Sequence, residues 1–257
     1  MVGARPAGAV LENWGWRSPL PQGNPIHNVV FANGIYVAVG DLGTILTSVD
    51  GAHWERRASG VSDMLRDCAY GAGTYVAVGD FGAVWTSTDL VNWTPQYAGT
   101  FYRLNGVTFA GGQFVAVGEQ TTILTSPDGV TWTQRSSGDW DLFDITYGNG
   151  SYAAVGGNAG NANSSPAAVI LTSTDGQFWT RRVVAYSSPV VSVAFGEGRF
   201  AAISQYAVST GDLWVSTNVA DWHSTASGIL DYPRVISYGA GKWLIGSGYS
   251  DEYASGP

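Results

Sequence analysis

The sequence has little of what several classes of protein require. It contains a single cysteine, Cys68, so no internal disulfide and no thiolate metal cluster can form. The formal net charge is 12 − 20 = −8 at pH 7, without a stripe of Lys and Arg that would bind nucleic acid. No apolar run approaches the roughly 20 residues that span a bilayer. The three histidines His27, His53 and His223 are not at the spacing of metal ligands. We therefore expect no cofactor, no metal, no nucleic-acid partner and no membrane insertion.

Two sequence motifs recur along the chain in step with each other. An aromatic residue followed by a small apolar run, typified by YVAVG, begins at residues 36, 75, 114, 152, 200 and 243, so successive copies lie 39, 39, 38, 48 and 43 residues apart. A second motif, TS-x-D-G-x-x-W and its variants, ends at tryptophans 54, 93, 132, 179 and 222. Two motifs that share one period indicate a repeat protein.

One repeat, residues 24–60, has the pattern of four short antiparallel strands. The expected strands are residues 26–31, 36–39, 44–47 and 53–57, separated by glycine-containing turns. Glycine occurs too often for helices, and no segment has helical apolar spacing. Four strands about every 40 residues are typical of a propeller blade. We predict an all-β, six-bladed β-propeller of four-stranded antiparallel blades.

The two ends of the chain are expected to share one blade. The last repeat stops after its second strand, near Gly248, whereas residues 9–12 (AVLE) and 14–21 (WGWRSPLP) match a third and a fourth strand. Pairing these segments would close the ring and protect the sheet edges. We expect residues 1–8 to be a disordered or vector-derived leader, without a visible signal peptide, and residues 9–257 to be one domain that is monomeric.

The TS-x-D-G-x-x-W motifs resemble Asp-box (BNR-type) repeats of sialidase-like, sortilin-like, xyloglucanase-like and photosystem-assembly propellers. The opening residues 14–24 and the YVAVG repeats resemble a broad set of bacterial, mostly exported, repeat proteins. The resemblance covers nearly the whole chain and implies a secreted or extracellular location. It implies a structural role for the boxes, because in those families they lie away from the active site.

The Asp or Asn of each box is expected to accept hydrogen bonds from backbone amides of its own turn. Features that differ between blades are therefore the better guide to function. In an up-and-down blade the loops between blades and the turns between the second and third strands share one face, and the variation falls there. Trp140 lies in such a loop, has no counterpart in other repeats, and is flanked by Asp139 and Asp141.

Aligning the first strands of the repeats places Arg66, Asp67, Asp144 and Arg234 near the mouth of the central channel. Carboxylates of the turns after the second strands are expected close by. The candidate ligand-binding residues are Trp140, Asp144, Arg66, Asp67, Arg103, Tyr102, Arg234, Tyr232, Asp41, Asp80 and Glu119. For Asp41 and Asp80 ordinary turn chemistry is the alternative, and for the arginines it is pairing with these same carboxylates.

Aromatic rings among carboxylates suit carbohydrate, so we predict a non-catalytic extracellular module that binds a glycan or a cell-surface or extracellular protein through this face. The first alternative is a carbohydrate-active enzyme, a hydrolase or lyase, with Asp67 and Asp144 as conceivable carboxylates. The second is a protein-docking scaffold. No catalytic residue is assigned, because no nucleophile elbow, P-loop or dinucleotide fingerprint is present.

Overall fold

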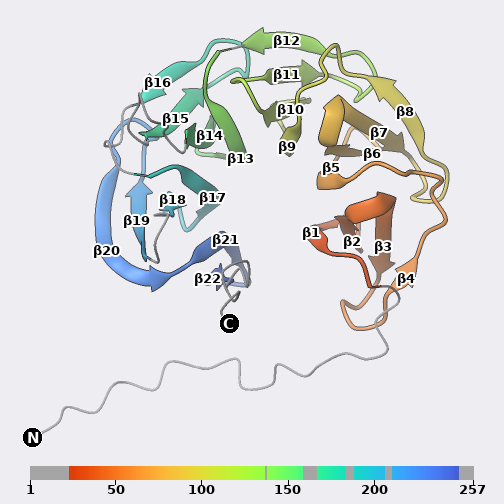
Figure 1. Ribbon diagram of the computed structural model, residues 1–257, viewed down its shortest axis with the longest axis horizontal. Coiled ribbons are helices and arrows are strands. Elements are labelled where there is room, and N and C mark those ends of the chain that lie inside the picture. Colours follow the sequence, from red (N-terminus) through yellow and green to blue (C-terminus); the bar gives the residue numbers. More distant parts are fainter. Residues whose placement is uncertain (1–22, 137, 159–166, 183–187, 206–209, 249–257) are drawn as a thin grey trace, which may run out of the picture.

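The computed structural model describes residues 23–136, 138–158, 167–182, 188–205 and 210–248, with only the backbone described at 210 and 226–231. In this part of the chain, five four-stranded antiparallel sheets and one two-stranded sheet lie around a common centre (Figure 1). Within each sheet the strands follow chain order from the centre outward, and we name them A, B, C and D. This is the architecture of a β-propeller.

The sheets are the blades of the propeller. The first blade consists of β1 (Ile26–Ala32), β2 (Ile35–Gly40), β3 (Thr44–Ser48) and β4 (Glu55–Arg56). The second consists of β5 (Leu65–Gly71), β6 (Thr74–Gly79), β7 (Ala83–Ser87) and β8 (Thr94–Tyr97). The third consists of β9 (Leu104–Ala110), β10 (Gln113–Gly118), β11 (Ile123–Ser126) and β12 (Thr133–Ser136).

The remaining blades follow the same order. The fourth consists of β13 (Asp141–Gly148), β14 (Ser151–Asn158), β15 (Ala167–Ser173) and β16 (Thr180–Arg182). The fifth consists of β17 (Val190–Gly196), β18 (Arg199–Ser204), β19 (Thr210–Ser216) and β20 (His223–Asp231). The sixth sheet contains β21 (Pro233–Gly239) and β22 (Lys242–Ser247). Residues 9–21, predicted to supply its other two strands, lie outside the described residues.

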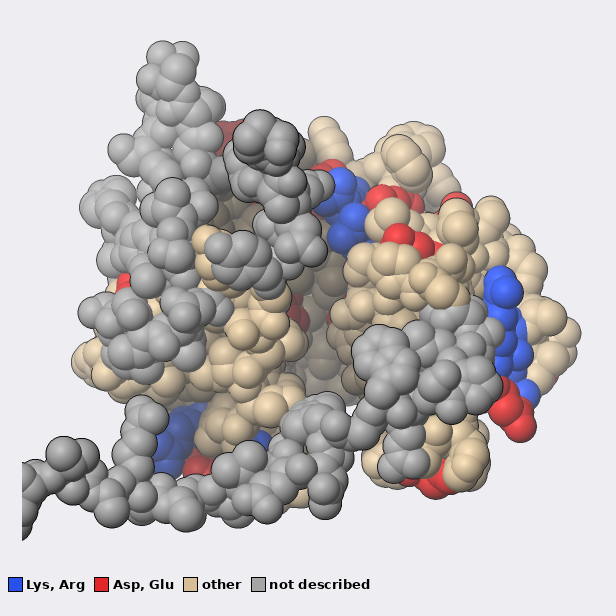
Figure 2. All heavy atoms as spheres, turned by 60° about the horizontal axis from the view of Figure 1, so that its bottom comes forward, with Lys and Arg blue, Asp and Glu red and all other residues tan. Residues whose placement is uncertain are grey.

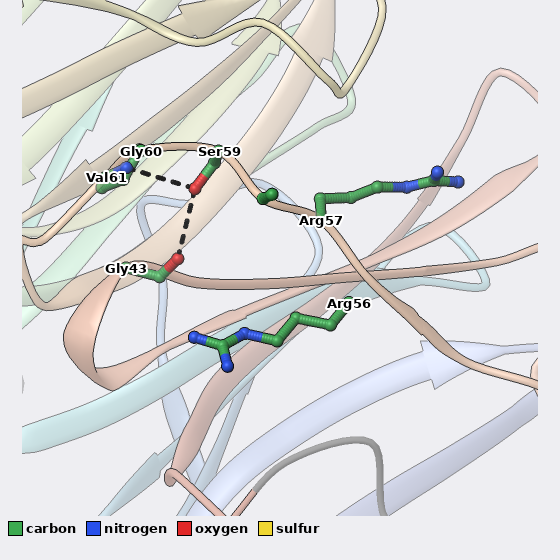
Figure 3. A pocket seen from close by; sticks show the side chains of 7 residues that line it. Gly43, Arg56, Arg57, Ser59, Gly60 and Val61 are labelled. Atoms are coloured by element: carbon green, nitrogen blue, oxygen red, sulfur yellow. Dashed lines mark hydrogen bonds between the residues drawn. The ribbon is translucent and has the colours of Figure 1, made fainter.

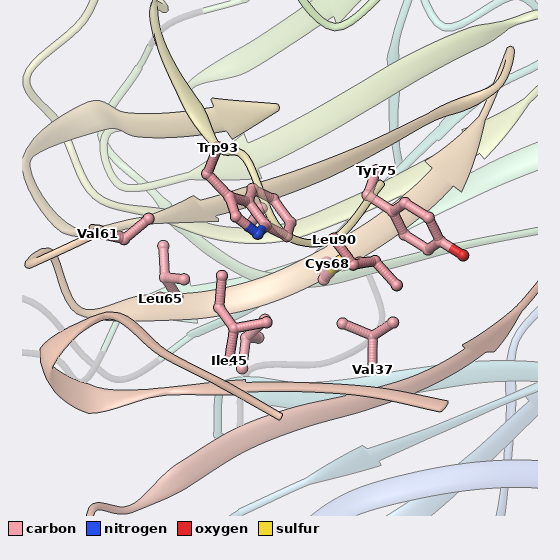
Figure 4. Close-up of a cluster of buried hydrophobic side chains, with 10 residues drawn as sticks. Val37, Ile45, Val61, Leu65, Cys68, Tyr75, Leu90 and Trp93 are labelled. Atoms are coloured by element: carbon pink, nitrogen blue, oxygen red, sulfur yellow. The ribbon is translucent and has the colours of Figure 1, made fainter. Parts of the chain in front are cut away.

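The core lies between neighbouring blades rather than inside any one of them. Between blades one and two, Val37 and Ile45 pack against Leu65, Cys68 and Trp93 (Figure 4). The B strands of blades two to five are buried on both faces because each lies between two adjacent blades. A sheet with two apolar faces buries both of them only when another sheet packs on each face. This packing explains why the same apolar pattern recurs in each repeat.

The Asp or Asn of each TS-x-D-G-x-x-W motif lies in the turn between strands C and D, as the sequence predicts. In the first motif, Asp50 Oδ1 accepts hydrogen bonds from the amides of Ala52 and His53, both at 2.8 Å. Asp89, Asp128, Asp175 and Asn218 make the equivalent pairs of bonds. These amides hold the carboxylate as an anion and lower the pKa of Asp128 and Asp175. The Asp and Asn side chains of these motifs therefore stabilise the C–D turns.

Every A strand contains a β-bulge near its start. The pairing of strands A and B skips one residue in each sheet, at His27, Arg66, Asn105, Phe143, Val191 and Arg234. A bulge turns the side chain of the extra residue away from the regular alternation. Two of these residues, His27 and Arg66, consequently reach the turn that follows their own B strand.

No helix in the described part of the chain is long and apolar enough to cross a membrane. The only helical segments described there are two short 3-10 turns, η1 (Asp41–Gly43) and η2 (Asp80–Gly82), which connect strands B and C of the first two blades.

Candidate functional site

The face that carries the B–C turns and the D–A loops, here called the turn face, holds a chain of four charged side chains. Arg66 Nε lies 2.5 Å from Asp80 Oδ1, and Arg103 Nε lies 3.2 Å from the same oxygen. Arg103 Nη2 lies 3.5 Å from Glu119 Oε1. Figure 2 shows basic and acidic side chains side by side next to the hollow at the centre of the view.

This charged chain joins blades two and three. Arg66 is the bulge residue of β5, Asp80 begins η2, and Arg103 ends the loop that leads into β9. The turns of one blade and the loop to the next are in contact, because Glu119 accepts a backbone bond from Arg103 at 3.3 Å. Four predicted site residues are thus brought together, and they neutralise one another.

A patch of exposed apolar side chains borders the charged chain. Phe81 is 82% exposed, Phe101 80% and Tyr102 49%. A Cβ placed on Gly82 would lie 3.4 Å from the Cα of Phe101, so the tip of η2 and the D–A loop adjoin. Arg103 follows Tyr102 directly, and Asp80 precedes Phe81. We call Phe81, Phe101, Tyr102, Arg66, Asp80, Arg103 and Glu119 the turn-face patch.

Phe81 is held in a backbone conformation that its side chain disfavours. Its φ and ψ are 56° and 29°, and Leu42 at the equivalent position of the first blade has φ 52° and ψ 42° with 68% of its surface exposed. The left-handed region costs a non-glycine residue about 1–2 kcal/mol. Glycine or asparagine would fill such a turn without an exposed apolar side chain. Both turns therefore present large apolar groups to solvent at a cost to the fold.

Asp41 belongs to the first of these turns and pairs with His27 rather than with an arginine. His27 Nε2 lies 2.5 Å from Asp41 Oδ1. His27 and Arg66 are equivalent bulge residues, and Asp41 and Asp80 are equivalent turn residues. The pair repeats in blade one the contact that Arg66 and Asp80 make in blade two.

Asp67 and Asp144 follow the bulge residues and bind the neighbouring blades. Asp67 Oδ1 accepts a bond from Asn28 Nδ2 at 2.6 Å and Oδ2 accepts one from the amide of Val107 at 2.7 Å. Asp144 Oδ2 accepts bonds from Ser192 Oγ at 2.8 Å and the amide of Val193 at 2.9 Å. Both carboxyl groups are committed to contacts that join blades.

Burial has the largest effect on the pKa of these two carboxyl groups. It raises the pKa of Asp67 to about 8 and that of Asp144 to about 6, although the hydrogen bonds act in the opposite direction. The charge of Asp144 raises the pKa of Asp67 further. In the folded protein each group therefore favours its neutral form more strongly than an exposed carboxyl does.

Trp140 packs onto the fourth blade. Its ring contacts the buried cluster of Val117, Leu142 and Leu171, and the Arg181 guanidinium carbon lies 4.5 Å from the ring centroid. Its carbonyl accepts bonds from the amide and hydroxyl groups of Thr121. The ring is half-buried and carries a cation on one face, which leaves it little free surface for stacking on a sugar.

The remaining candidates lie elsewhere. Arg234 is an exposed bulge residue of β21, and half-buried Tyr232 lies just before that strand, in the sheet at the far end of the arc from blade one (Figure 1). The lengthened B–C loops at 156–168 and 204–212 lie partly outside the described residues, which omit 159–166 and 206–209. Within the described ranges, no group of three His, Cys, Asp or Glu side chains is placed to hold a metal ion.

Cavities among the described residues lie outside the turn-face patch. One of about 430 Å³ opens on the central channel and is lined by inner-strand residues that include Asn28, Asp144 and Ser192. Another, of about 420 Å³, lies beside the loop after β4. There Ser59 Oγ bonds the Gly43 carbonyl at 3.5 Å, while Arg56 and Arg57 point in different directions (Figure 3). Neither of these two cavities is lined by Arg66, Asp80, Arg103 or Glu119.

Sequence reasoning did not single out Leu42 and Phe81. The signal was present, because a large apolar residue between Asp and Gly is unusual in a tight turn that favours Gly or Asn at its centre. It was overlooked because the turn motif was assigned to the repeat as a whole.

Comparisons with known proteins support the fold. No protein-family model matches the sequence, and no curated protein matches it. Ycf48 from Cyanidioschyzon merolae is similar in structure, with a TM-score of 0.61 at 17% identity over 86% of this chain and 78% of that one.

A structure of Ycf48 bound to a D1 peptide has a TM-score of 0.60 at 17% identity, over 79% of this chain and 67% of that one. The extracellular domain of a putative hybrid two-component system from B. thetaiotaomicron has a TM-score of 0.64 at 11% identity, over 86% of this chain and 31% of that one. At these identities the likeness establishes a β-propeller scaffold.

Proposed function

We propose that this protein is a non-catalytic docking propeller that binds an extended segment of another protein at the turn-face patch of blades two and three, which we call the docking site from here on. One observation carries the proposal. Phe81 and Phe101 are more than three-quarters exposed and border a chain of ion pairs that includes two arginines. Aromatic residues and arginine are the residue types that contribute most binding energy in protein interfaces.

The chemistry of the docking site suits a peptide with apolar side chains better than a charged ligand. Arg66 and Arg103 are balanced by Asp80 and Glu119, so the site has no net charge. Burying Phe81 or Phe101 under a partner stabilises the complex by roughly 1.5–3 kcal/mol each. Polar groups of the partner can then bond to the exposed part of the Arg103 guanidinium.

The comparison with Ycf48 supports a peptide as the ligand class. Its structure with a D1 peptide is an instance of a propeller of similar shape that holds a protein segment. The sequence-based preference for a glycan stays a prediction, and the contacts of Trp140 with Arg181 and the buried cluster weigh against its use as a sugar platform. The carboxylates that the enzyme alternative would use, Asp67 and Asp144, bind backbone amides of the next blade.

We also propose that the complete protein has six blades in a closed ring. The two strands β21 and β22 repeat the A and B strands of the other blades, and Val235 and Ile236 of β21 line the channel cavity together with Asn28 of β1.

The docking proposal is tested with a random-peptide display library panned on the immobilised protein. Affinities of selected peptides are then measured by fluorescence polarisation for the parent, for Phe101→Ala and for Phe178→Ala. Phe178 is 81% exposed but lies in a C–D turn on the opposite face, so it is the matched control. We expect Phe101→Ala to weaken binding about tenfold or more, equivalent to about 1.4 kcal/mol, and Phe178→Ala to leave it unchanged.

Two results would count against the proposal. One is equal loss of affinity in both variants, which would indicate nonspecific apolar adhesion. The other is a library that yields no binder while a polysaccharide gel retains the protein in a manner that depends on Trp140, which would favour the glycan prediction instead.

A further inference from the structure

The turn after strand B of blade one repeats the turn of blade two with different charged neighbours. In blade two, Asp80 Oδ1 is within ion-pair distance of both Arg66 Nε and Arg103 Nε. Asp41 is the equivalent residue of η1, and in the described part of the chain its ion pair is with His27, which is a cation only when protonated. The carboxylate of blade one is therefore without the two permanent cations that the carboxylate of blade two has.

One of these two differences lies at Met64, which is the equivalent of Arg103. Each residue directly precedes an A strand, and each carbonyl accepts the amide that begins the next B–C turn: Asp80 N donates to Met64 O at 3.1 Å, and Glu119 N to Arg103 O at 3.0 Å. The side chain of Arg103 reaches back to the turn of the preceding blade. A methionine at this position cannot supply the charge to Asp41, because a thioether is neutral.

The apolar surface of the docking site continues in the same direction, onto blade one. Leu42 follows Asp41 as Phe81 follows Asp80, and it is 68% exposed in a left-handed conformation. The amide of Gly43 donates to the Asp63 carbonyl at 2.7 Å, so the tip of η1 adjoins the loop that contains half-buried Met64. Leu42 and Met64 thus extend the line of apolar side chains that begins with the aromatic residues of the docking site.

The charge of this extension differs from that of the docking site. Asp63 adds a second carboxylate, whose Oδ2 accepts a bond from Trp85 Nε1 at 2.8 Å. Arg56 lines the cavity beside Gly43 (Figure 3), and no ion pair among the described residues joins it to Asp41 or Asp63. The docking site is neutral, whereas its continuation over blade one is acidic, in a protein with a net charge of −8. Such a surface is complementary to a basic partner.

We propose that the segment bound at the docking site continues over blade one, where it places an apolar side chain on Leu42 and a Lys or Arg beside Asp41. The basic side chain of the partner takes the place that Arg103 takes beside Asp80 in the next blade. The partner is therefore a basic, apolar segment, which names the ligand class of the docking site and rests on the docking proposal. The negative charge of the protein speeds its association with such a segment.

Met64→Arg tests this assignment, because it supplies from the protein's own loop the cation that the partner is expected to bring. The probe is a peptide selected from the display library on the parent protein, with its affinity measured by fluorescence polarisation at low ionic strength. Met64→Arg should bind about fivefold more weakly than Met64→Gln, which has a similar length and no charge. High salt should reduce this difference. Val130→Arg adds the same charge in an exposed C–D turn on the opposite face and should bind as the parent does.

The peptide supplies the second half of the test. Selected peptides should contain Lys or Arg, and replacing these residues by Met should remove the difference between Met64→Arg and Met64→Gln. Leu42→Gly should weaken binding about fivefold, since it removes an exposed apolar contact and leaves a turn that glycine accommodates.

Three results would overturn the inference: selected peptides without basic residues, equal affinities of Met64→Arg and Met64→Gln, or an equal loss in Val130→Arg. Phe101→Ala, measured on the same peptides, separates this inference from the docking proposal. If Phe101→Ala weakens binding while the two Met64 variants are alike, the docking site stands and its extension over blade one is wrong. If Phe101→Ala binds as the parent does, the docking proposal itself is wrong.

Discussion

Replacing Phe81 by glycine should leave the fold as stable as before, or slightly more stable, while removing peptide binding. The reason is that Phe81 sits in the left-handed region and is 82% exposed. Removing the side chain relieves about 1–2 kcal/mol of backbone strain. Glycine's greater freedom in the unfolded chain takes back about 0.4–1 kcal/mol.

The lost burial is small. Only 18% of the Phe81 surface is covered, and full burial of a phenylalanine stabilises by about 1.5–3 kcal/mol, so the loss is about 0.3–0.5 kcal/mol. The net change in the free energy of unfolding is therefore about +0.5 kcal/mol. A core phenylalanine would instead lose about 3–5 kcal/mol on truncation, and the two outcomes are easily separated.

Urea denaturation and peptide affinity are measured on the same preparation. Gln120→Gly is the matched control, because Gln120 occupies the turn after strand B of blade three with φ 54° and is exposed. It should show a similar small gain in stability with unchanged affinity. A loss of 2 kcal/mol or more in Phe81→Gly would refute the reasoning, because Phe81 would then be needed by the fold rather than by a partner.

Three further predictions concern stability. Asp128→Ala removes the acceptor of two backbone amides, as loss of a helix N-cap does, and should lower the free energy of unfolding by about 1–2 kcal/mol in urea. The raised pKa values of Asp67 and Asp144 mean that their neutral forms favour the fold, so their contribution is fully present below about pH 4 and is lost as the pH rises through about 6 and 8. The free energy of unfolding should fall between pH 5 and 8, and less so in Asp67→Asn; parallel pH profiles would contradict this. Gly82→Ala should destabilise by more than 1 kcal/mol, because φ is +71° and the new Cβ would collide with the Thr100 carbonyl; an unchanged urea midpoint would show that the turn can relax.

The repeat predicted the blades well because its signals are local. The glycines at the A–B turns and the TS-x-D-G-x-x-W motifs at the C–D turns specify backbone geometry within a few residues of themselves. Strands 26–31, 36–39 and 44–47 were accordingly found nearly at their predicted bounds. The fourth strand is shorter than predicted, because only Glu55–Arg56 pairs with β3. Ring closure depends on residues outside those the structure describes, and stays a proposal.

The site was harder to predict because its contacts cross between blades. Of the eleven candidate residues, the structure brings Arg66, Asp80, Arg103 and Glu119 together. Asp67 directly follows Arg66 in the sequence, yet its carboxylate points to the Val107 amide of the next blade. The β-bulge in strand A points the side chains of Arg66 and Asp67 in different directions. The position of a bulge depends on the pairing with strand B and not on the bulged residues alone.

The central claim, that the turn face of blades two and three is a docking surface, is tested most directly by site-specific photocrosslinking. A benzophenone amino acid replaces Phe101 in one variant and Phe178, on the opposite face, in another, and each is irradiated with a peptide selected from the display library. We predict a crosslinked product from position 101, competed by excess unlabelled peptide, and none from position 178. Crosslinking from position 178 alone, or equally from both, would contradict the claim.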